Sequence, residues 1–473
     1  MKIALLQKIP FEFIGIMFLS SVIKRLGHEC EVFISNIDRS HLLENVRRYS
    51  PDLIAFSLMS NDYSWFKDTM SSLQQTSSDI PLIVGGPHAT FFPELIECNN
   101  VKAVFLGEAE GSLEEFLSNY ENEDSLKSID GIWYKDNHGA IHKNKMRLLC
   151  DNLDELPFPD RGLYYDKYNV LRMKESKIFM TTRGCPYRCT FCYSNICQRL
   201  YQGKGKYFRQ FSPERIIQEI KETKERYLLK SVSFEDFGEF ANDPQLLIKF
   251  LSLYKKEVNL PFKCSLRANM MTDALAKSLK DAGVNTVIFG IESGVEHIRN
   301  TILNKKIKDD HIIECARMLK KHRIKFGTYN MFGIPSETID DAFKTVELNI
   351  RIKTDYPWGS ILIPYPKTDI AKIAVQLKLM PEFFDFAELP PSYFSSSPLN
   401  LPQKHAFENL QKVFYIAVKY PLIFPLLKKL IRINCPLFFK AFFIVSFIIR
   451  FSKEQSMPLW KTMRMAWGFR DSF

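Results

Sequence analysis

Three cysteines, Cys185, Cys189 and Cys192, follow residues 177–182, an apolar stretch that is predicted to be a strand. The cysteines therefore lie on the loop at the carboxyl end of that strand, where barrel-like folds carry their chemistry. Three thiolates within eight residues can surround one compact metal centre, and thiolates are ligands of iron–sulfur clusters and of zinc. A structural zinc site needs four closed ligands, and only Cys197 is available as a fourth. Zinc is therefore the weaker alternative.

The cysteines are spaced C-x3-C-x-F-C, and the aromatic Phe191 directly precedes the third cysteine. This pattern resembles the signature of the radical S-adenosylmethionine superfamily. The resemblance implies that the three cysteines bind three irons of a [4Fe-4S] cluster and that the fourth iron chelates S-adenosylmethionine, which Phe191 would contact. One electron from the cluster then breaks a sulfur–carbon bond and yields a 5′-deoxyadenosyl radical, which abstracts hydrogen from a substrate.

Charged residues follow the next predicted strands, at positions that resemble those of the S-adenosylmethionine contacts of the superfamily. Glu235 ends the second strand, where a carboxylate would match the ammonium group, although the glycine pair common in the family is absent. Arg267 ends the third strand, and Glu292 and Ser293 end the fourth, where the family contacts the carboxylate and the ribose. A surface carboxylate remains the alternative for Glu292, and a structural role remains the alternative for Arg267.

Two turns extend the resemblance over residues 176–370. Residues 333–338 read Gly-Ile-Pro-Ser-Glu-Thr after the fifth strand, and residues 364–368 read Pro-Tyr-Pro-Lys-Thr after the sixth. They resemble the Gly-Leu-Pro-Gly-Glu-Thr and Pro-Tyr-Pro-Gly-Thr turns of the family. In this chain, Ser336 and Lys367 occupy the positions at which glycine is common. A purely structural role is the alternative for both turns.

The elements that must position these residues alternate regularly between strands and helices. Strands are expected at residues 177–182, 231–235, 262–268, 286–292, 325–332 and 359–364, with helical segments such as 213–227, 274–282 and 311–322 between them. Six such units fall short of an eight-unit barrel. The sequence therefore predicts a partial, open (β/α)6 barrel of the TIM type.

The first part of the chain has a second alternation of this kind. Strands are expected at residues 2–6, 31–35, 52–58, 81–84 and 103–106, with amphipathic segments such as 14–26 and 63–75 between them. Strands that are apolar throughout and separated by helices indicate a parallel sheet that is buried on both faces. An α/β fold with an N-terminal doubly wound, Rossmann-like domain follows.

Small and polar residues stand at the ends of these strands. Ser57 ends the third strand, Gly85 and Gly86 follow the fourth, and Gly107 and Glu108 follow the fifth. Glycines there let a backbone approach a bulky ligand closely, and ligands of such folds bind beyond the carboxyl ends of the strands. Placed ahead of a radical domain, these residues resemble the cobalamin-binding domain of class B radical methyltransferases and of anaerobic magnesium-protoporphyrin monomethyl ester cyclases. The alternative is a domain that keeps this fold and has lost the cofactor.

Histidine-ligated cobalamin domains carry Asp-x-His-x-x-Gly after the first strand, and the corresponding residues 7–15 contain no histidine. His41 follows the wrong strand, and His88 is predicted to be a loop residue. The resemblance therefore implies cobalamin bound without a histidine ligand.

Four regions are expected: the cobalamin-binding-like domain at 1–140, a connector at 141–175, the radical barrel at 176–370, and a mainly helical C-terminal domain at 371–473. From Leu401 on there are 12 Lys or Arg and 3 Asp or Glu, so the segment carries 12 − 3 = +9 of the net charge of +10. No nucleic-acid-reading motif accompanies this charge. The interleaved apolar and basic residues 420–450 would either pack on the barrel or touch a membrane surface.

The predicted enzyme is cytoplasmic, because its cysteines resemble reduced core thiols and residues 1–12 form no signal-peptide core; membrane association is possible through the tail. The resemblance implies an electron donor such as flavodoxin or ferredoxin. The substrate is expected to be a small molecule. A hydrophobic substrate would be consistent with contact between the C-terminal segment and a membrane surface. The leading hypothesis is cobalamin-dependent methylation of an unactivated carbon. The alternatives are an oxidative cyclase of the anaerobic type and a non-catalytic, metal-binding, membrane-associated protein; no catalytic side chain is identified.

Overall fold

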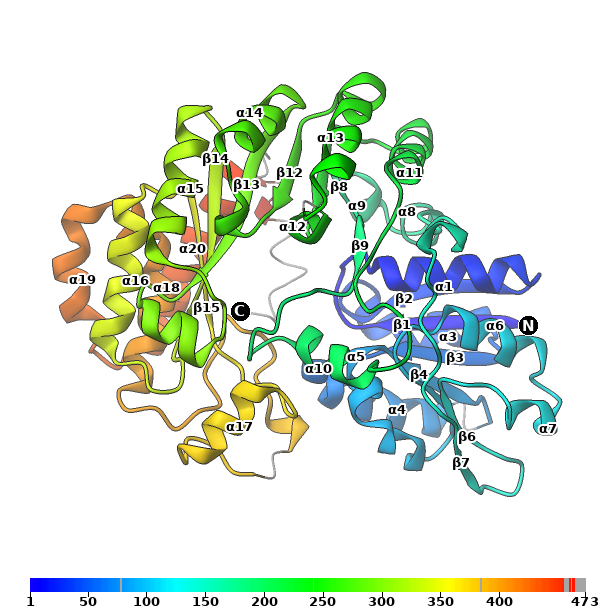
Figure 1. Cartoon of the computed structure of the whole chain (residues 1–473). Helices are drawn as coiled ribbons and strands as arrows, with labels where there is room; N and C mark the ends of the chain where they lie inside the picture. Colours follow the sequence, from blue (N-terminus) through cyan, green and yellow to red (C-terminus); the bar gives the residue numbers. More distant parts are fainter. Residues whose placement is uncertain (77–78, 241, 383–384, 455–458, 461, 464–473) are drawn as a thin grey trace. The chain divides into compact units, whose positions relative to one another are not determined.

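The structure is a computed structural model that describes residues 1–76, 79–240, 242–382, 385–454, 459–460 and 462–463. It divides into two units (Figure 1). Unit 1 comprises residues 1–174 together with 197–209, and unit 2 comprises residues 175–196 together with 210–473. The segment that follows the cysteine loop therefore belongs to unit 1, although the loop itself belongs to unit 2.

Unit 1 is built on a seven-stranded sheet in the order β2-β1-β3-β4-β5-β6-β7. The first five strands pair in parallel, and β6 and β7 extend the sheet as an antiparallel hairpin. The strands are β1 (Lys2–Gln7), β2 (Glu29–Ile34), β3 (Leu53–Ser57), β4 (Leu82–Gly85), β5 (Val101–Phe105), β6 (Ile132–Lys135) and β7 (Ile141–Lys143). The order 2-1-3-4-5 is doubly wound, and it has its switch point between β1 and β3, where such folds bind their ligands.

Both faces of this sheet are covered, as the uniformly apolar strands predict. Along β1, Ala4 and Leu6 face a core that includes α3 to α5, while the alternating residues Ile3 and Leu5 are buried on the opposite face. The helices of unit 1 are α1 (Ile14–Arg25), α2 (Ser35–Asp38), α3 (Leu42–Tyr49), α4 (Tyr63–Thr76), α5 (Gly86–Phe91), α6 (Glu110–Ser118), α7 (Glu123–Leu126), α8 (Gly162–Tyr165) and α9 (Asn169–Arg172).

Unit 2 contains a six-stranded sheet in the order β15-β14-β13-β12-β11-β8, and every neighbouring pair is parallel (Figure 1). The strands are β8 (Ser176–Phe179), β11 (Ser231–Phe234), β12 (Phe262–Ser265), β13 (Val284–Glu292), β14 (Lys325–Phe332) and β15 (Tyr356–Ile361). The intervening helices are α11 (Pro213–Arg226), α12 (Phe237–Phe240), α13 (Pro244–Leu253), α14 (Asp273–Asp281), α15 (Asp309–Lys321) and α16 (Ile339–Arg351), and α17 (Asp369–Gln376) follows β15. This is the predicted partial barrel.

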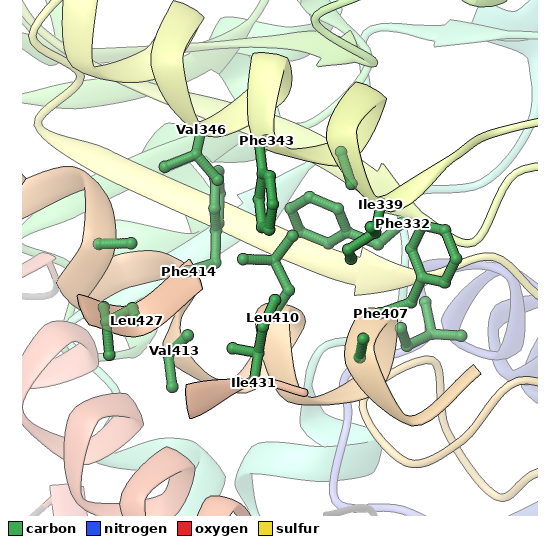
Figure 2. Packing of buried hydrophobic residues seen from close by; sticks show 14 of the residues in the cluster. Phe332, Ile339, Phe343, Val346, Phe407, Leu410, Val413, Phe414, Leu427 and Ile431 are labelled. Carbon is green, nitrogen blue, oxygen red and sulfur yellow. The ribbon is translucent and has the colours of Figure 1, made fainter. Parts of the chain in front are cut away.

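The C-terminal helices complete the core of unit 2. Helix α18 (Lys404–Lys419) places Leu410 and Phe414 against Phe332 of β14 and Phe343 of α16 (Figure 2). The buried Gln411 side chain donates from Nε2 to the Gly359 carbonyl of β15 over 3.0 Å. Helices α19 (Phe424–Leu430) and α20 (Pro436–Glu454) follow. The C-terminal segment is therefore helical, as expected, and it packs on the barrel.

Three local predictions differ from the structure. The first barrel strand is interrupted, because β8 ends at Phe179 and a separate short strand, β9 (Thr182–Arg183), follows. The sixth strand begins at Tyr356, earlier than predicted, and contains Pro357. Because β15 pairs in this sheet with β14 only, a proline can occupy it without breaking a ladder on its outer side. His88 lies in helix α5, not in a loop.

Within the described residues, no helix is long and apolar enough to cross a membrane.

Two turns of unit 2 hold residues other than glycine in the left-handed backbone region. Ser336 has a φ of 70° and Lys367 a φ of 67°, and both side chains are exposed. In the family turns that these two turns resemble, glycine is common at both positions. The left-handed conformation costs a residue with a Cβ about 1–2 kcal/mol, whereas glycine adopts it without steric cost.

We expect Ser336→Gly to raise the stability of unit 2 by about 0.5–1 kcal/mol, because relief of strain exceeds the entropy that glycine adds to the unfolded chain. The midpoint of thermal unfolding should then rise by about 2 °C. Ser278→Gly, inside α14, is the matched control and should lower the midpoint, since glycine weakens a helix interior. Equal shifts in the same direction for both variants would contradict the strain argument.

Candidate functional site

The three cysteines lie on the loop between β9 and α10 (Tyr193–Leu200). Cys185, Cys189 and Cys192 are all partly buried. The loop turns at Gly184, which has a φ of 80°, and the Cys192 amide donates to the Cys189 carbonyl over 3.2 Å. Three thiols are therefore presented by one short, turned segment.

The start of the cysteine loop is held by the carboxylate of Asp236, which directly follows Glu235. Oδ2 of Asp236 accepts from the backbone amides of Thr181 and Thr182 over 2.8 and 2.6 Å. The two threonine hydroxyls also donate to this carboxylate, over 3.0 and 3.2 Å. Burial raises the pKa of Asp236 to about 6, because the donated hydrogen bonds only partly offset the loss of hydration.

The far end of the loop is held by segments that follow β13 and β15. Thr190 donates its amide to the Leu303 carbonyl over 3.1 Å and its hydroxyl to the Ile302 carbonyl over 2.7 Å, and its own carbonyl accepts from the Ile370 amide. Asn195 donates to the Asp369 carboxylate over 2.7 Å. Phe191 packs against an apolar cluster that consists of Ile298, Leu303, Met331, Ile334, Leu362 and Ile370. The loop is thus tied to segments that follow three other strands, β11, β13 and β15.

The chemistry of the three thiols can be compared with that of metal sites in proteins. In the described part of the chain, no three histidine, cysteine, aspartate or glutamate side chains are gathered to hold one metal ion. In a cubane cluster each thiolate binds a different iron, so its ligands stand further apart than those of one ion. Three thiols on a turned, anchored loop are donors of the kind that an iron–sulfur cluster uses.

Glu235 lies at the carboxyl end of β11 with a partly exposed side chain. Its Oε1 accepts from the Ser233 hydroxyl over 2.7 Å and lies 3.3 Å from the Lys263 ammonium. Burial acts to raise the pKa of Glu235, but the Lys263 charge and the hydrogen bond from Ser233 outweigh it, so the pKa lies below that of an ordinary glutamate. The side chain is therefore a carboxylate at neutral pH, as a partner for an ammonium group must be.

Glu292 ends β13 in a strained backbone conformation and is paired with a buried lysine. Its φ is 64°, and the register of β13 on β14 shifts beside it. Lys305 donates from Nζ to Glu292 Oε1 over 2.6 Å, and both side chains are 9% exposed. Residues other than glycine in the left-handed backbone region are typical of functional sites, where the surrounding structure holds them in that conformation. The predicted alternative of a surface carboxylate is wrong for Glu292.

Arg267 and Ser293 lie next to this pair. The Arg267 guanidinium donates to the Lys305 carbonyl, and its Cζ lies 3.7 Å from the centre of the Tyr187 ring on the cysteine loop. Ser293 is fully buried; its hydroxyl accepts from the Val295 amide over 3.2 Å. Arg267, Glu292 and Ser293 are therefore brought together at the ends of neighbouring strands, with Lys305 between the first two.

The turn after β14 contains a buried carboxyl group. Oε2 of Glu337 accepts from the amides of Gly333 and Ile334 over 2.8 and 3.1 Å. Its Oε1 is buried without a hydrogen-bond partner among the described residues. Burial raises the pKa of Glu337 to about 8, so this group is protonated at neutral pH.

In unit 1, the loops after β1 and β3 meet at the switch point of the sheet. Gln7 is buried; its Nε2 donates to the carbonyls of Ile9 and Phe11 over 2.7 and 2.9 Å, and its Oε1 accepts from the Tyr164 hydroxyl over 2.5 Å. Phe11 and Met59 are exposed apolar side chains on these two loops, at 37% and 43%. The edge therefore offers an apolar surface beside an anchored backbone.

Two of the glycines predicted at the cobalamin site, Gly86 and Gly107, have a positive φ and no room for a side chain. Gly86 has a φ of 91°, and a Cβ there would lie 2.8 Å from the Leu58 amide nitrogen. Gly107 has a φ of 70°, and a Cβ there would overlap the hydroxyl of Tyr201. Gly85 and Ser57 end the paired strands β4 and β3. Local packing thus explains Gly86 and Gly107 independently of a ligand.

The Glu108 side chain has a partner that sequence reasoning did not find. Arg209, which is 3% exposed, donates to both carboxylate oxygens of Glu108, and the Tyr201 hydroxyl accepts from the Glu108 amide over 2.9 Å. Both partners come from residues 197–209, which follow the cysteine loop in sequence. The role of Ser57, Gly85, Gly86, Gly107 and Glu108 in cobalamin binding remains a prediction.

The two histidines considered as cobalt ligands have different surroundings. His88 is 1% exposed in α5, and its Nδ1 lies 3.1 Å from the Ser60 hydroxyl. His41 is on the surface beside Glu44.

Comparison with known families now identifies the class of protein. Residues 179–348 match the model of the radical SAM superfamily, and residues 10–117 match that of the B12 binding domain. The chain is a radical S-adenosylmethionine enzyme with an N-terminal cobalamin-binding domain, and its cofactors are a [4Fe-4S] cluster, S-adenosylmethionine and cobalamin.

Individual relatives agree with this class. An uncharacterised methyltransferase of Pyrococcus horikoshii is 27% identical and covers 78% of this chain and 79% of its own. The anaerobic magnesium-protoporphyrin IX monomethyl ester cyclase of Rubrivivax gelatinosus is 21% identical over 78% of this chain and 67% of its own. The structure of the cobalamin-dependent radical enzyme OxsB with aqua-cobalamin and S-adenosylmethionine bound has a TM-score of 0.67 and 16% identity, covering 99% of this chain and 79% of that one. The last comparison shows a shared fold.

Two residues of the barrel were missed as parts of the site. Asp236 was noticeable only as the residue after Glu235, and nothing in the sequence indicated that it anchors the cysteine loop. Lys305 lies in a loop without periodicity, and its pairing with Glu292 arises from the fold alone. Because long-range pairs have no sequence signal in a single chain, neither role could have been predicted.

We expect Asp236→Ala to weaken retention of the iron–sulfur cluster about tenfold or more, because two buried threonine amides lose their acceptor and the loop loosens. The measurement is the rate at which a chelator bleaches the cluster absorbance under anaerobic conditions. Asp236→Asn should hold the cluster nearly as well as the unsubstituted protein, since its side-chain oxygen can still accept from both amides. Asp281→Asn, on the exposed end of α14, is the control; equal bleaching in Asp236→Ala and this control would contradict the anchoring role.

We expect Glu337→Gln to remove a pH dependence of stability. The folded-state pKa of Glu337, about 8, lies above the unfolded value of about 4.3, so its stabilisation is complete below the lower value and is lost as the pH rises through the higher one. Glutamine resembles the protonated acid and can accept the same two amide hydrogen bonds. The thermal midpoint of the unsubstituted protein should therefore fall relative to the variant between about pH 5 and pH 8. Parallel curves for the two proteins would show that Glu337 is ionised throughout.

Proposed function

We propose that this enzyme methylates an unactivated carbon of a small molecule and uses cobalamin as the methyl carrier. One observation supports this proposal above the others: one chain contains both an anchored three-thiol loop and a doubly wound cobalamin-binding domain, and a relative named as a methyltransferase is similar over 78% of the chain. When bound, the cluster supplies the electron that cleaves S-adenosylmethionine, and cobalamin supplies a methyl group.

The side chains of unit 2 are assigned roles by their charge and position. We propose that Cys185, Cys189 and Cys192 hold the cluster and that Phe191, packed behind the loop, keeps their spacing while it contacts S-adenosylmethionine. Glu235 would accept hydrogen bonds from the ammonium group of S-adenosylmethionine, because its carboxylate is charged and reachable from solvent. These residues bind and orient, and none of them is required to transfer a proton.

The carboxylate of S-adenosylmethionine requires a cation, and the hydroxyls of its ribose require an acceptor. Arg267 would bind its carboxylate, and Glu292 with Ser293 would contact the ribose. Lys305 is a positioning residue in this proposal, since its ammonium holds the strained Glu292 in place and its carbonyl holds Arg267. An uncompensated buried Glu292 would be costly, which explains why a buried cation accompanies it.

For cobalamin, we propose the edge of unit 1 formed by the loops after β1, β3, β4 and β5. Ser57, Gly85, Gly86, Gly107 and Glu108 lie along this edge, and Phe11 and Met59 add apolar contacts. The anchored loop that contains Gln7 occupies the position at which histidine-ligated domains carry their histidine. We therefore propose that cobalt receives no histidine ligand from this chain.

Cyclisation is the second candidate, because the cyclase of Rubrivivax gelatinosus is similar over most of this chain. It would use the same cofactor sites and differ in the fate of the substrate radical. An oxidised product without an added carbon would distinguish this outcome from methylation.

The environment of the enzyme follows from its chemistry. We propose a cytoplasmic location, where thiols stay reduced, and an electron donor of the flavodoxin or ferredoxin type. A hydrophobic small-molecule substrate fits an enzyme whose C-terminal segment contacts a membrane, but neither property is needed for the assignment of the reaction.

The proposal predicts that anaerobically reconstituted protein, supplied with cobalamin, S-adenosylmethionine and a chemical reductant, forms 5′-deoxyadenosine. Cys189→Ser should reduce this product at least a hundredfold, because one iron loses its thiolate. Cys435→Ser, at an exposed position in the loop before α20, is the matched control and should retain full formation. The product is measured by liquid chromatography with mass spectrometry.

Methylation is tested separately with S-adenosylmethionine labelled in its methyl group. Extracts that contain the substrate should yield a product heavier by one labelled methylene unit, and this product should require cobalamin. Intact cluster without 5′-deoxyadenosine would refute the radical reaction, and 5′-deoxyadenosine with an oxidised, unlabelled product would replace methylation by cyclisation or oxidation.

A further inference from the structure

Helix α20 is apolar on two faces, although it buries only one. The buried residues Phe439, Phe443, Ser446 and Arg450 recur at intervals of four, three and four, as one face of a helix does. Phe439 belongs to the core that also contains Phe343 and Leu427. The inner face of α20 is thus accounted for by packing on unit 2.

The outer face of α20 is equally apolar but exposed. Leu437 is 80% exposed and Val445 59% exposed, and Phe438 is 57% exposed. The segment before it continues this pattern, with Leu422 at 96% and Leu426 at 59%. We call the set the outer apolar surface: Leu422, Leu426, Ile433, Leu437, Phe438, Val445 and Ile449. A helix at a water-facing surface normally carries polar residues on that side, so this surface requires a partner.

The charged residues of the segment that carries the outer apolar surface have a single sign. Between residues 409 and 452 the sequence contains seven Lys or Arg and no Asp or Glu. Lys428 is neutralised by Glu347 at 2.8 Å, and Arg450 is buried over the Trp358 ring. Lys429, Arg432 and Lys440 are exposed on the described surface, close in sequence to the exposed apolar residues.

We propose that the outer apolar surface lies in the headgroup layer of an anionic lipid bilayer, with α19 and α20 flat on the membrane. Leu437 and Phe438 would enter the boundary of the acyl chains, while Lys429 and Arg432 would bind lipid phosphates. The surface binds at the interface and does not cross the bilayer, in line with the described helices, none of which can span one. This proposal goes beyond the proposed reaction and does not rest on it.

A second copy of the chain is a poorer occupant for the same surface. In a twofold symmetric dimer the same patch meets itself, so the exposed Lys and Arg would be brought together without a carboxylate to neutralise them. An anionic bilayer supplies both the apolar layer and the opposite charge.

The test is sedimentation of the holoenzyme with vesicles of phosphatidylcholine alone, and with vesicles in which about one third of the lipid is phosphatidylglycerol. We expect binding to the anionic vesicles that weakens with salt. Lys429→Ala with Arg432→Ala should reduce the partition coefficient about thirtyfold, because each basic residue near such a surface contributes about a factor of five. Leu437→Ser with Phe438→Ser should reduce it at least tenfold without a change in charge.

Matched controls lie elsewhere on unit 2. Ile248→Ser with Leu377→Ser removes two exposed apolar side chains, 65% and 47% exposed, and Lys255→Ala with Lys256→Ala removes two exposed lysines. Both control variants should bind vesicles like the unsubstituted protein. In the absence of vesicles, all variants should form 5′-deoxyadenosine equally, so failure of the lipid proposal can be distinguished from failure of the proposed reaction.

Three results would overturn the proposal. The first is equal binding of the unsubstituted protein to both vesicle types, or to neither. The second is unchanged binding by Leu437→Ser with Phe438→Ser. The third is a dimer in light scattering that this variant converts to a monomer, which would assign the surface to a second copy of the chain.

Discussion

The candidate site of unit 2 depends on one constraint, which is that parallel strands in sequential order bring their carboxyl ends to the same edge. The carboxyl ends of β11, β12 and β13 carry Glu235, Arg267 and Glu292, respectively. Neighbouring strands of the sheet lie about 5 Å apart. Residues separated by dozens of positions thereby become neighbours without any direct attraction between them. The side chains supply the chemistry, while the strand order supplies their proximity.

The cysteine loop is the part of the site that strand order cannot position, because it leaves the sheet after β9. Its geometry depends instead on polar groups that are at least partly buried: Asp236 holds one end, and Thr190 and Asn195 hold the other. A partly buried carboxylate such as Asp236 loses hydration, so it is stable only where several donors point at it. Burying these polar groups costs hydration, but their hydrogen bonds make the loop rigid. A cluster held by three fixed ligands requires such rigidity.

Much of the fold could be predicted from the sequence, because buried parallel strands are apolar throughout and helices have a visible period. The predicted start of β15 was too late, because a proline such as Pro357 usually argues against a strand. Its tolerance here depends on the edge position of β15, which is a property of the sheet and not of the local sequence. Gly107 shows a different limit. Its glycine was correctly noticed, but the Tyr201 hydroxyl that requires it arrives from a segment almost a hundred residues away.

The C-terminal segment illustrates why composition alone left two interpretations open. An apolar, basic stretch can be explained by packing on the barrel or by contact with a membrane, and these explanations are usually treated as exclusive. In α20 they apply to different faces, because Phe439 and Phe443 satisfy the core while Leu437 and Val445, on the same helix, do not. The helical period divides the residues between the two environments, so packing on the barrel accounts for the inner face of α20 and leaves its exposed apolar face to a different partner.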